Sequence, residues 1–363
     1  MKLQVTQENL NQALNSVGRV ASGRNTLPIL SNVLIKTANN RLSLSATNLD
    51  IAIVHYIGAK ISEEGAITVP ARLMQDFVGS LPSGVIELEL TNTKLKVTTE
   101  QYHSVVNGIV ADDFPVMPTI THGKSWKLDC GALKKGLQQT VFAASSDETR
   151  QVLTGVFIHS KDSKLYVAAT DSYRLAEKEL SKSIEDVKML IPASAMNDLL
   201  RIMGDFEGEV NVTHDGQQVL FQVGDVELTA RLVEGNYPDY QKLIPGEFAS
   251  SIQLSKPDFV NVTKVSSLFA RESAGSVTIE LDNKSGSLNI RSVASQIGEN
   301  TATALGKVIG GGSITLNSRY LLDALQVLTG DEVYFGFNGK LEPTILKDPK
   351  DPSYKHIIMP LKS

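Results

Sequence analysis

Apolar and polar residues alternate with a period of two over many short stretches of this chain. Arg41–Ser45 and Glu209–Val212 are two clear examples. Successive side chains of a strand point to opposite faces, so a period of two predicts strands that bury one face of a sheet. The chain is therefore expected to be rich in half-buried strands.

Near the start of each third of the chain, a helix is expected between the strands. The leucine pairs Leu10 with Leu14 and Leu133 with Leu137 are four residues apart, which places both members of a pair on one helix face. A residue favoured as an N-cap precedes each expected helix. These caps are Thr6, Asp129 and Ser255.

A second helix is expected later in each third. It begins at a proline or asparagine suited to a helix entrance and runs to a glycine near its end. The expected starts are Pro70, Pro192 and Asn317, and the corresponding glycines are Gly79, Gly204 and Gly330.

The chain also repeats itself at an offset of 123 residues. Leu30–Ile35 recurs as Leu153–Ile158, and Ala46–Asn48 recurs as Ala169–Asp171. The turn Asp113–Pro115 returns as Asn236–Pro238 at the same offset, and the helix entrance Val69–Met74 is matched by Ile191–Met196 at an offset of 122. A period of this length indicates repeated domains rather than a solenoid.

A third copy of the repeat is fainter. Ser276–Leu281 and Leu316–Leu321 stand where the earlier copies have a strand and a helix entrance, whereas the Phe-Pro type of turn is missing. Three copies of two helices on a mostly antiparallel sheet predict an α+β fold. The predicted domains are residues 1–122, 123–248 and 249–363, separated by linkers at 119–124 and 245–250.

Composition narrows the class of protein. The single cysteine, Cys130, cannot form an intrachain disulfide, which favours a reducing compartment. The start of the chain shows no signal-peptide pattern, and no apolar run approaches the roughly 18 residues of a membrane span. We expect a cytoplasmic protein without a membrane partner, and the net charge of −5 argues against a sequence-specific DNA binder.

No catalytic or metal-binding pattern is found. Gly123–Ser125 imitates the end of a phosphate-binding loop, but Pro118 occupies the position of its first glycine. The six histidines show no metal-ligand spacing, and Asp112–Asp113 and Asp147–Glu148 are typical of turns and caps. We expect a non-enzymatic protein with no catalytic residues, no metal and no cofactor.

Several segments, taken together, resemble the bacterial DNA polymerase III beta subunit family, the beta clamps. The resemblance spans the whole chain. The segments that carry it are Arg24–Leu30, Val69–Arg72, Ser146–Arg150, Ala169–Leu175, Asn236–Tyr240 and Met359–Leu361.

This resemblance implies three clamp domains per subunit and a head-to-tail homodimeric ring whose helices line a central hole. Such a ring slides on duplex DNA, and it holds DNA through diffuse contacts with phosphates rather than by reading bases. The implied partners are DNA polymerase III alpha and other polymerases, the clamp loader, and repair factors with clamp-binding motifs. The candidate DNA-binding residues are Arg24, Arg72, Arg19, Lys134, Lys135, Arg201, Lys264 and Arg319.

The resemblance also implies a hydrophobic pocket, between the second and third domains, for short linear motifs of those partners. Ser172 and Tyr173 replace the more usual Gly-His, and Lys242 stands where arginine is common, so an altered peptide preference is expected. The implied pocket residues are Leu153, Thr170, Arg174, Leu175, Pro238, Lys242, Leu243, Asn317, Tyr320, Leu341, Pro343, Ile357, Ile358, Met359 and Pro360.

Ring closure would join the first domain of one subunit to the third domain of the other. By position, the resemblance selects Leu268 and Phe269 packing near Ser104 and Val106, with edge strands pairing across the joint. Two equivalent head-to-tail contacts close a ring. Ser104 is smaller than the aromatic residue expected there.

Two other functions compete with the clamp. One is a scaffold that binds only proteins through the same interdomain groove. The other is an enzyme with its site at a domain junction, built from Asp171, Tyr173 and Arg174.

Overall fold

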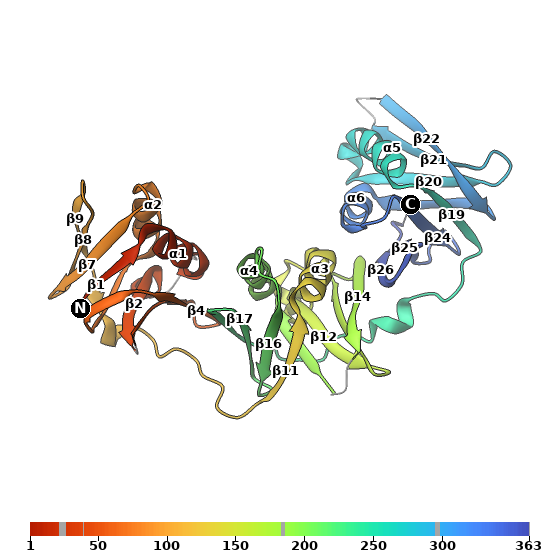
Figure 1. Ribbon diagram of the computed structural model, residues 1–363. Coiled ribbons are helices and arrows are strands. Elements are labelled where there is room, and N and C mark those ends of the chain that lie inside the picture. Colours follow the sequence, from red (N-terminus) through yellow and green to blue (C-terminus); the bar gives the residue numbers. More distant parts are fainter. Residues whose placement is uncertain (22–26, 39, 183–185, 295–297, 363) are drawn as a thin grey trace. The chain divides into compact units, whose positions relative to one another are not determined.

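The computed structural model describes residues 1–21, 27–38, 40–182, 186–294 and 298–362 (Figure 1). Within these ranges the chain forms six α-helices and 26 β-strands. Its contacts divide it into two compact units, of which the first comprises Met1–Gly131 and Asn197–Leu232 and the second the remaining described residues. None of the described helices is long and apolar enough to cross a membrane.

The helices begin where the sequence predicts them. Thr6 precedes the first helix and accepts a hydrogen bond from the Asn9 amide at 3.3 Å, while Ser255 and Asn317 cap two others through their side chains. The helices are α1 (Gln7–Ala21), α2 (Ala71–Ser80), α3 (Cys130–Thr140), α4 (Ala193–Met203), α5 (Lys256–Phe269) and α6 (Ser318–Val327).

The first unit contains two antiparallel sheets. The smaller has the strand order β5 (Lys60–Glu63), β1 (Lys2–Thr6), β7 (Val85–Thr91), β8 (Lys94–Thr98) and β9 (His103–Asn107). The larger has the order β10 (Ile109–Val110), β6 (Ala66–Pro70), β2 (Asn32–Ala38), β3 (Arg41–Thr47), β4 (Ile51–Gly58), β18 (Val226–Arg231), β17 (Gln218–Val223), β16 (Glu209–His214) and β11 (Lys124–Asp129).

The second unit contains one sheet of twelve strands, also antiparallel. Its order is β15 (Lys188–Pro192), β12 (Gly155–Lys161), β13 (Lys164–Thr170), β14 (Arg174–Lys182), β26 (Asp351–Ile358), β25 (Thr344–Asp348), β24 (Glu332–Phe337), β19 (Ser250–Ser255), β22 (Gly298–Ile309), β21 (Ser287–Ala294), β20 (Ser276–Asp282) and β23 (Gly312–Asn317).

The repeats are joined to one another by strand pairing. In the first unit β4 of the first copy pairs with β18 of the second, and in the second unit β14 of the second copy pairs with β26 of the third. A sheet that runs through a junction fixes the register of the two copies, because a slip of one residue would turn every side chain to the other face.

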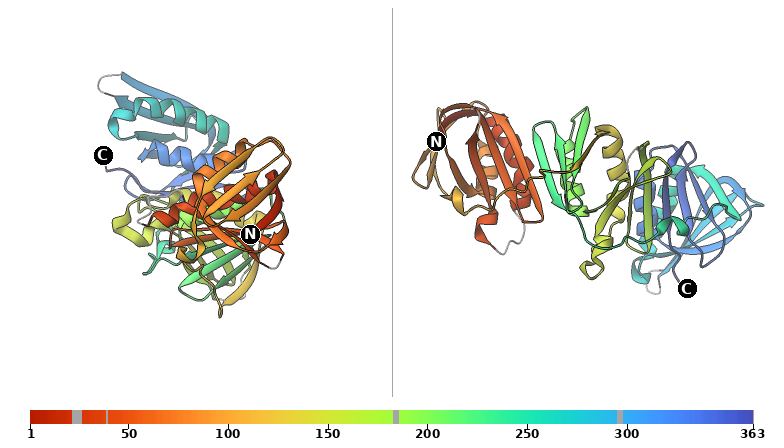
Figure 2. Two further views of the ribbon diagram at one scale, coloured as in Figure 1. Left: turned by 90° about the vertical axis from the view of Figure 1, so that its left-hand side faces the viewer. Right: turned by 90° about the horizontal axis from the view of Figure 1, so that it is seen from below.

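Each helix covers a sheet with its apolar face. The predicted pairs Leu10 with Leu14 and Leu133 with Leu137 are fully buried. Helix α1 packs against β2, β3 and β4 and lies beside α2, and helix α5 packs against β19, β21 and β22 and lies beside α6 (Figure 1, Figure 2). The predicted α+β architecture with antiparallel sheets is confirmed.

Candidate functional site

The α-helices carry positive charge although the chain as a whole is acidic. They contain eight lysines and arginines and five aspartates and glutamates, a formal charge of +3. The full chain has a formal charge of −5, which leaves −8 on everything outside the helices. The difference comes mainly from the carboxylates, since 35 of the 40 aspartates and glutamates lie outside these helices.

Seven of the predicted DNA-contacting cations lie on these helices, and Arg24 lies outside the described residues. Lys134 and Lys135 on α3 are half-buried. The other five are exposed: Arg19 on α1, Arg72 on α2, Arg201 on α4, Lys264 on α5 and Arg319 on α6.

Among the described residues, Arg201 and Lys135 form ion pairs with carboxylates of the same chain. The Nη1 atom of Arg201 lies 2.5 Å from Asp198 Oδ1, one helical turn away. The Nζ atom of Lys135 lies 3.2 Å from Asp351 Oδ2, which also pairs with Lys178 at 2.8 Å. Lys135 therefore ties α3 to β26 as well as contributing positive charge.

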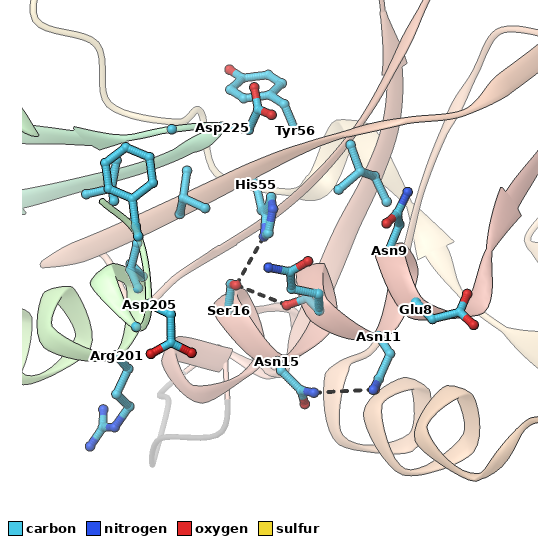
Figure 3. A pocket seen from close by; sticks show the side chains of 18 of the residues that line it. Glu8, Asn9, Asn11, Asn15, Ser16, His55, Tyr56, Arg201, Asp205 and Asp225 are labelled. Carbon is cyan, nitrogen blue, oxygen red and sulfur yellow. Dashed lines mark hydrogen bonds between the residues drawn. The ribbon is translucent and has the colours of Figure 1, made fainter. Parts of the chain in front are cut away.

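A polar groove of about 1050 Å³ lies in the first unit, between the outward face of α1 and the end of α4 (Figure 3). Arg19 and Arg201 line it, together with the amide side chains of Asn9, Asn11 and Asn15. Cations and neutral amides can both donate hydrogen bonds to phosphate oxygens. The groove is therefore chemically suited to contact a phosphate backbone.

Carboxylates also line this groove, so its charge is mixed. Glu8, Asp198, Asp205 and Asp225 are among the lining residues. Burial raises the pKa of the Asp198 carboxyl, although the charges of Arg201 and Arg19 act in the opposite direction. This mixed charge makes the groove less favourable for phosphate than a lining of cations and amides alone would be.

His55 stabilises the floor of the groove. Its Nδ1 atom lies 3.0 Å from Ser16 Oγ, and the Ser16 hydroxyl donates to the Gln12 carbonyl at 3.0 Å (Figure 3). Burial lowers the pKa of His55, which favours the neutral ring near pH 7. The pair links β4 to α1 and fixes the helix that carries Arg19.

In the second unit, the predicted pocket residues Thr170 and Arg174 flank a turn between β13 and β14. Thr170 Oγ1 donates to the Arg174 carbonyl at 2.6 Å and accepts from the Ser172 amide at 3.2 Å. Asp171 Oδ1 accepts from the amides of Tyr173 and Arg174, both at 2.9 Å. These bonds fix the position from which the Arg174 side chain extends.

The guanidinium of Arg174 joins this turn to α6. It contacts Asp171 Oδ2 at 3.0 Å, Asp323 Oδ2 at 2.5 Å and the Phe142 carbonyl at 2.8 Å. It also lies over the ring of Tyr320, 4.6 Å from the centroid. Neither Asp323 nor Phe142 was predicted from the sequence as a partner of Arg174.

The predicted enzymatic alternative gains no support from this geometry. Both carboxylate oxygens of Asp171 are engaged, one by backbone amides and the other by Arg174. Such a carboxylate orders a turn and is poorly placed to accept a proton from a substrate. In the described part of the chain, no three histidine, cysteine, aspartate or glutamate side chains gather to hold a metal ion.

Apolar residues of the predicted pocket form part of a buried cluster. Leu175 pairs with Ile357 across β14 and β26, and both pack with Tyr240 and Ile345. Ile358 is fully buried, and Leu153 is 5% exposed. These side chains are core residues of the second unit, so they are not exposed for contact with a ligand.

The exposed apolar side chains of the predicted pocket are Leu243 and Leu341, at 53% and 66%. Met359 is half-buried, and its amide donates to the Tyr173 carbonyl at 2.8 Å. Lys242 is exposed and pairs with Asp239 at 2.8 Å. Pro238 is exposed and Asn317, Tyr320, Pro343 and Pro360 are half-buried.

Among the described strand edges that are open for pairing, two lie near the predicted joint. Strand β9 is the last strand of its sheet, and residues 298–305 of β22 pair only with β21. On β9 the predicted Val106 is buried at 6%, Ser104 is half-buried, and the exposed residue is Val105 at 58%. Near the other edge, Leu268 is 50% exposed, Phe269 is half-buried, and Leu305, which the sequence analysis missed, is 70% exposed.

Family models match nearly the whole chain. They are the N-terminal domain of the DNA polymerase III beta subunit at residues 1–118, its central domain at 127–239 and its C-terminal domain at 241–362. The three matches follow the order of the three repeats.

Comparisons with individual proteins indicate the same family as the family models. The chain is 32% identical to the beta sliding clamp of Synechocystis sp., over 100% of this chain and 99% of that protein. Its structure resembles the DNA polymerase sliding clamp of Bacillus subtilis with a TM-score of 0.95, at 29% identity and with 100% and 99% of the two chains covered. It also resembles the sliding clamp of Bartonella birtlesii bound to griselimycin, with a TM-score of 0.95, 29% identity and both chains covered completely.

Proposed function

The chain belongs to the DNA polymerase III beta subunit family, the beta sliding clamps, and on that premise we propose that two copies close head to tail around duplex DNA and tether polymerases to it. Members of this family are accessory factors of replication and have no catalytic role. The observation that carries the DNA-encircling part of the proposal is the segregation of charge, +3 on the helices of a chain with a charge of −5.

This charge distribution suits a protein that must slide. A helix-lined hole with a modest positive potential attracts phosphates without fixing any one of them, and an acidic exterior keeps DNA from binding elsewhere. The exposed Arg19, Arg72, Lys264 and Arg319 would contact phosphates most directly. Arg201 would contribute less, because Asp198 is within 2.5 Å.

Ring closure would use the open edges of β9 and β22. An edge strand presents unpaired amide and carbonyl groups to a second chain, and one such edge in each terminal repeat allows two equivalent joints to close a dimer. The exposed Leu268 and Leu305 would add apolar contact area beside the paired strands. Phe269, Ser104 and Val106 would lie near the same joint.

The ring is tested by introducing charge at the joint. Leu305→Asp should convert a dimer into a species with the mass of one chain in sedimentation-velocity runs. Val85→Asp is the matched control, because Val85 is 59% exposed on β7, which already has strand partners on both sides. The proposed ring would be contradicted by a wild-type protein that sediments as a monomer, or by a Leu305→Asp variant that is as dimeric as the control.

The second part of the proposal is that peptides bind beside the turn Thr170–Arg174, called the Arg174 turn below. Exposed leucines above an ordered apolar layer suit an extended segment with aliphatic or aromatic anchors. DNA polymerase III alpha, other polymerases, the clamp loader and repair factors would dock there in turn. A protein-only scaffold would share this pocket but would not need a net positive charge on its helices.

A further inference from the structure

The first unit contains a turn with the same construction as the Arg174 turn. Thr47 Oγ1 donates to the Ile51 carbonyl at 2.9 Å and accepts from the Leu49 amide at 3.0 Å. Asn48 Oδ1 accepts from the amides of Asp50 and Ile51 at 3.1 and 2.8 Å. Thr47–Ile51 therefore corresponds, bond for bond, to Thr170–Arg174 at the other junction.

The strands beside the two turns correspond as well. Ile51 pairs with Ala230 of β18, just as Arg174 pairs with Ile358 of β26. Arg231 and Met359 directly follow Ala230 and Ile358 in the sequence, so they hold equivalent places. Pro115 and Pro238 are equivalent by the same offset of 123 residues.

A small pocket lies at this first junction, inside the first unit. Its volume is about 120 Å³, and Thr47, Leu49, Pro115, Val116, Thr229 and Arg231 are among its lining residues. A cavity of about 150 Å³ accepts a benzene-sized group, so this pocket has room for one aliphatic side chain.

The rim of the pocket combines apolar surface with one cation. Leu49 is 47% exposed and Val116 is 95% exposed. Arg231 is exposed, and the lining also contains the exposed carboxylate of Asp50, with which Arg231 forms no ion pair in the described part of the chain. An exposed apolar rim beside an available guanidinium suits a ligand that offers an aliphatic group and a carboxylate.

We propose that this pocket is a second docking site for linear peptide segments, specific for a leucine-sized side chain next to an aspartate or glutamate. The segment would insert its aliphatic side chain between Leu49 and Val116 and place its carboxylate on Arg231. At the other junction Met359 stands in place of Arg231, so the two sites select different segments. One subunit can then hold two partners at once.

A binding experiment can read the two junctions separately. The protein is labelled with ¹³C at leucine and valine methyl groups, and Leu49 and Val116 report on the first junction while Leu243 and Leu341 report on the second. The probe is the peptide acetyl-Asp-Leu-Ser-amide, and acetyl-Lys-Leu-Ser-amide is its charge-reversed counterpart. We expect the methyl resonances of Leu49 and Val116 to shift in a saturable way with the acidic peptide. The lysine peptide should bind at least about fivefold more weakly, since Arg231 pairs with the carboxylate.

Variants of the protein complete the test. Arg231→Gln should weaken binding of the acidic peptide at the first junction by about five- to tenfold. Arg41→Gln, which changes an exposed arginine of the same sheet already paired with Asp225 at 2.7 Å, should leave it unchanged. Absence of saturation at Leu49 and Val116 up to 10 mM peptide, or equal binding by Arg231→Gln, overturns the proposal. Shifts confined to Leu243 and Leu341 also overturn it, while they support the pocket at the second junction.

Discussion

Leu49 and Ser172 hold the same left-handed backbone conformation, with φ at 78° in both, although they lie 123 positions apart. Each is the third residue of a turn that joins two strands of its copy. A residue with a Cβ atom is strained in this conformation by roughly 1–2 kcal/mol. The usual glycine of the family at the position of Ser172 thus has a physical reason, and this chain tolerates the strain because side-chain hydrogen bonds hold each turn.

Replacing Ser172 with glycine should stabilise the protein. Relief of the strain exceeds the larger backbone entropy of glycine in the unfolded chain, and we expect a net gain of about 0.5–1 kcal/mol in the free energy of unfolding. Urea titration followed by circular dichroism measures it. Ser172→Ala keeps the Cβ atom and should give no gain, so equal effects of the two substitutions would disprove the strain.

Arg174 should be the most sensitive residue of the second junction. Arg174→Ala leaves Asp171 and the Phe142 carbonyl without their charged donor, which should cost about 3 kcal/mol in the free energy of unfolding. Arg174→Lys retains the charge but loses the planar fork, so about half of that loss is expected. Arg150→Ala, which removes an exposed pair with Asp147 at 3.0 Å, should cost less than about 1 kcal/mol, and a ranking in the reverse order would refute the assigned role.

Acid should destabilise the second unit through His356. Burial lowers the pKa of its fully buried ring to about 3, and the charge of Arg174 acts in the same direction. Between pH 6.5 and 3 the unfolded chain binds a proton that the folded chain excludes, so stability falls as the pH falls, by up to about 1.4 kcal/mol per pH unit.

Urea titrations between pH 7 and 4.5 measure this slope. His356→Gln should flatten it, whereas His122→Gln should not, since the ring of His122 is exposed. An identical slope in wild type and His356→Gln would show that other groups control the acid response.

The exposed leucines of the second junction should control peptide affinity without affecting folding. Leu243→Ala and Leu341→Ala each remove an anchor surface that is more than half exposed, and we expect each to weaken binding of a labelled Leu- and Phe-bearing peptide by about five- to thirtyfold, the effect of about 1–2 kcal/mol. Fluorescence anisotropy measures the affinity. Leu73→Ala, a 52% exposed leucine on α2, is the control, and equal losses in all three variants would argue against a localised pocket.

The helices could be predicted from the sequence because their signals are local. Thr6 and Ser255 directly precede the helices that they cap, and the leucine spacing of α1 and α3 follows the helical period. The contact between Arg174 and Asp323 spans 149 residues and leaves no local pattern. The resemblance to the family placed Arg174 in a site, but only the folded chain identifies Asp323 and Phe142 as its partners.

The residues exposed at the open strand edges also could not be predicted from local sequence patterns. The resemblance selected Val106 by position, whereas the exposed valine of β9 is Val105. The alternation along β9 alone does not reveal which face meets the core. Leu305 was missed because β22 pairs with different strands along its two halves. Exposure at a strand edge depends on which strands pair, and that is settled by tertiary structure.

Retention on DNA of different topology tests the central proposal most directly. The protein is loaded by a clamp loader onto nicked circular DNA, at a salt concentration high enough to screen non-specific phosphate contacts, and the circle is then cut by a restriction enzyme. A ring that encircles the duplex remains on the circle and leaves once the DNA has ends. Equal release from circular and linear DNA, by protein shown to be loaded, would contradict the encircling clamp and leave a scaffold that binds only proteins.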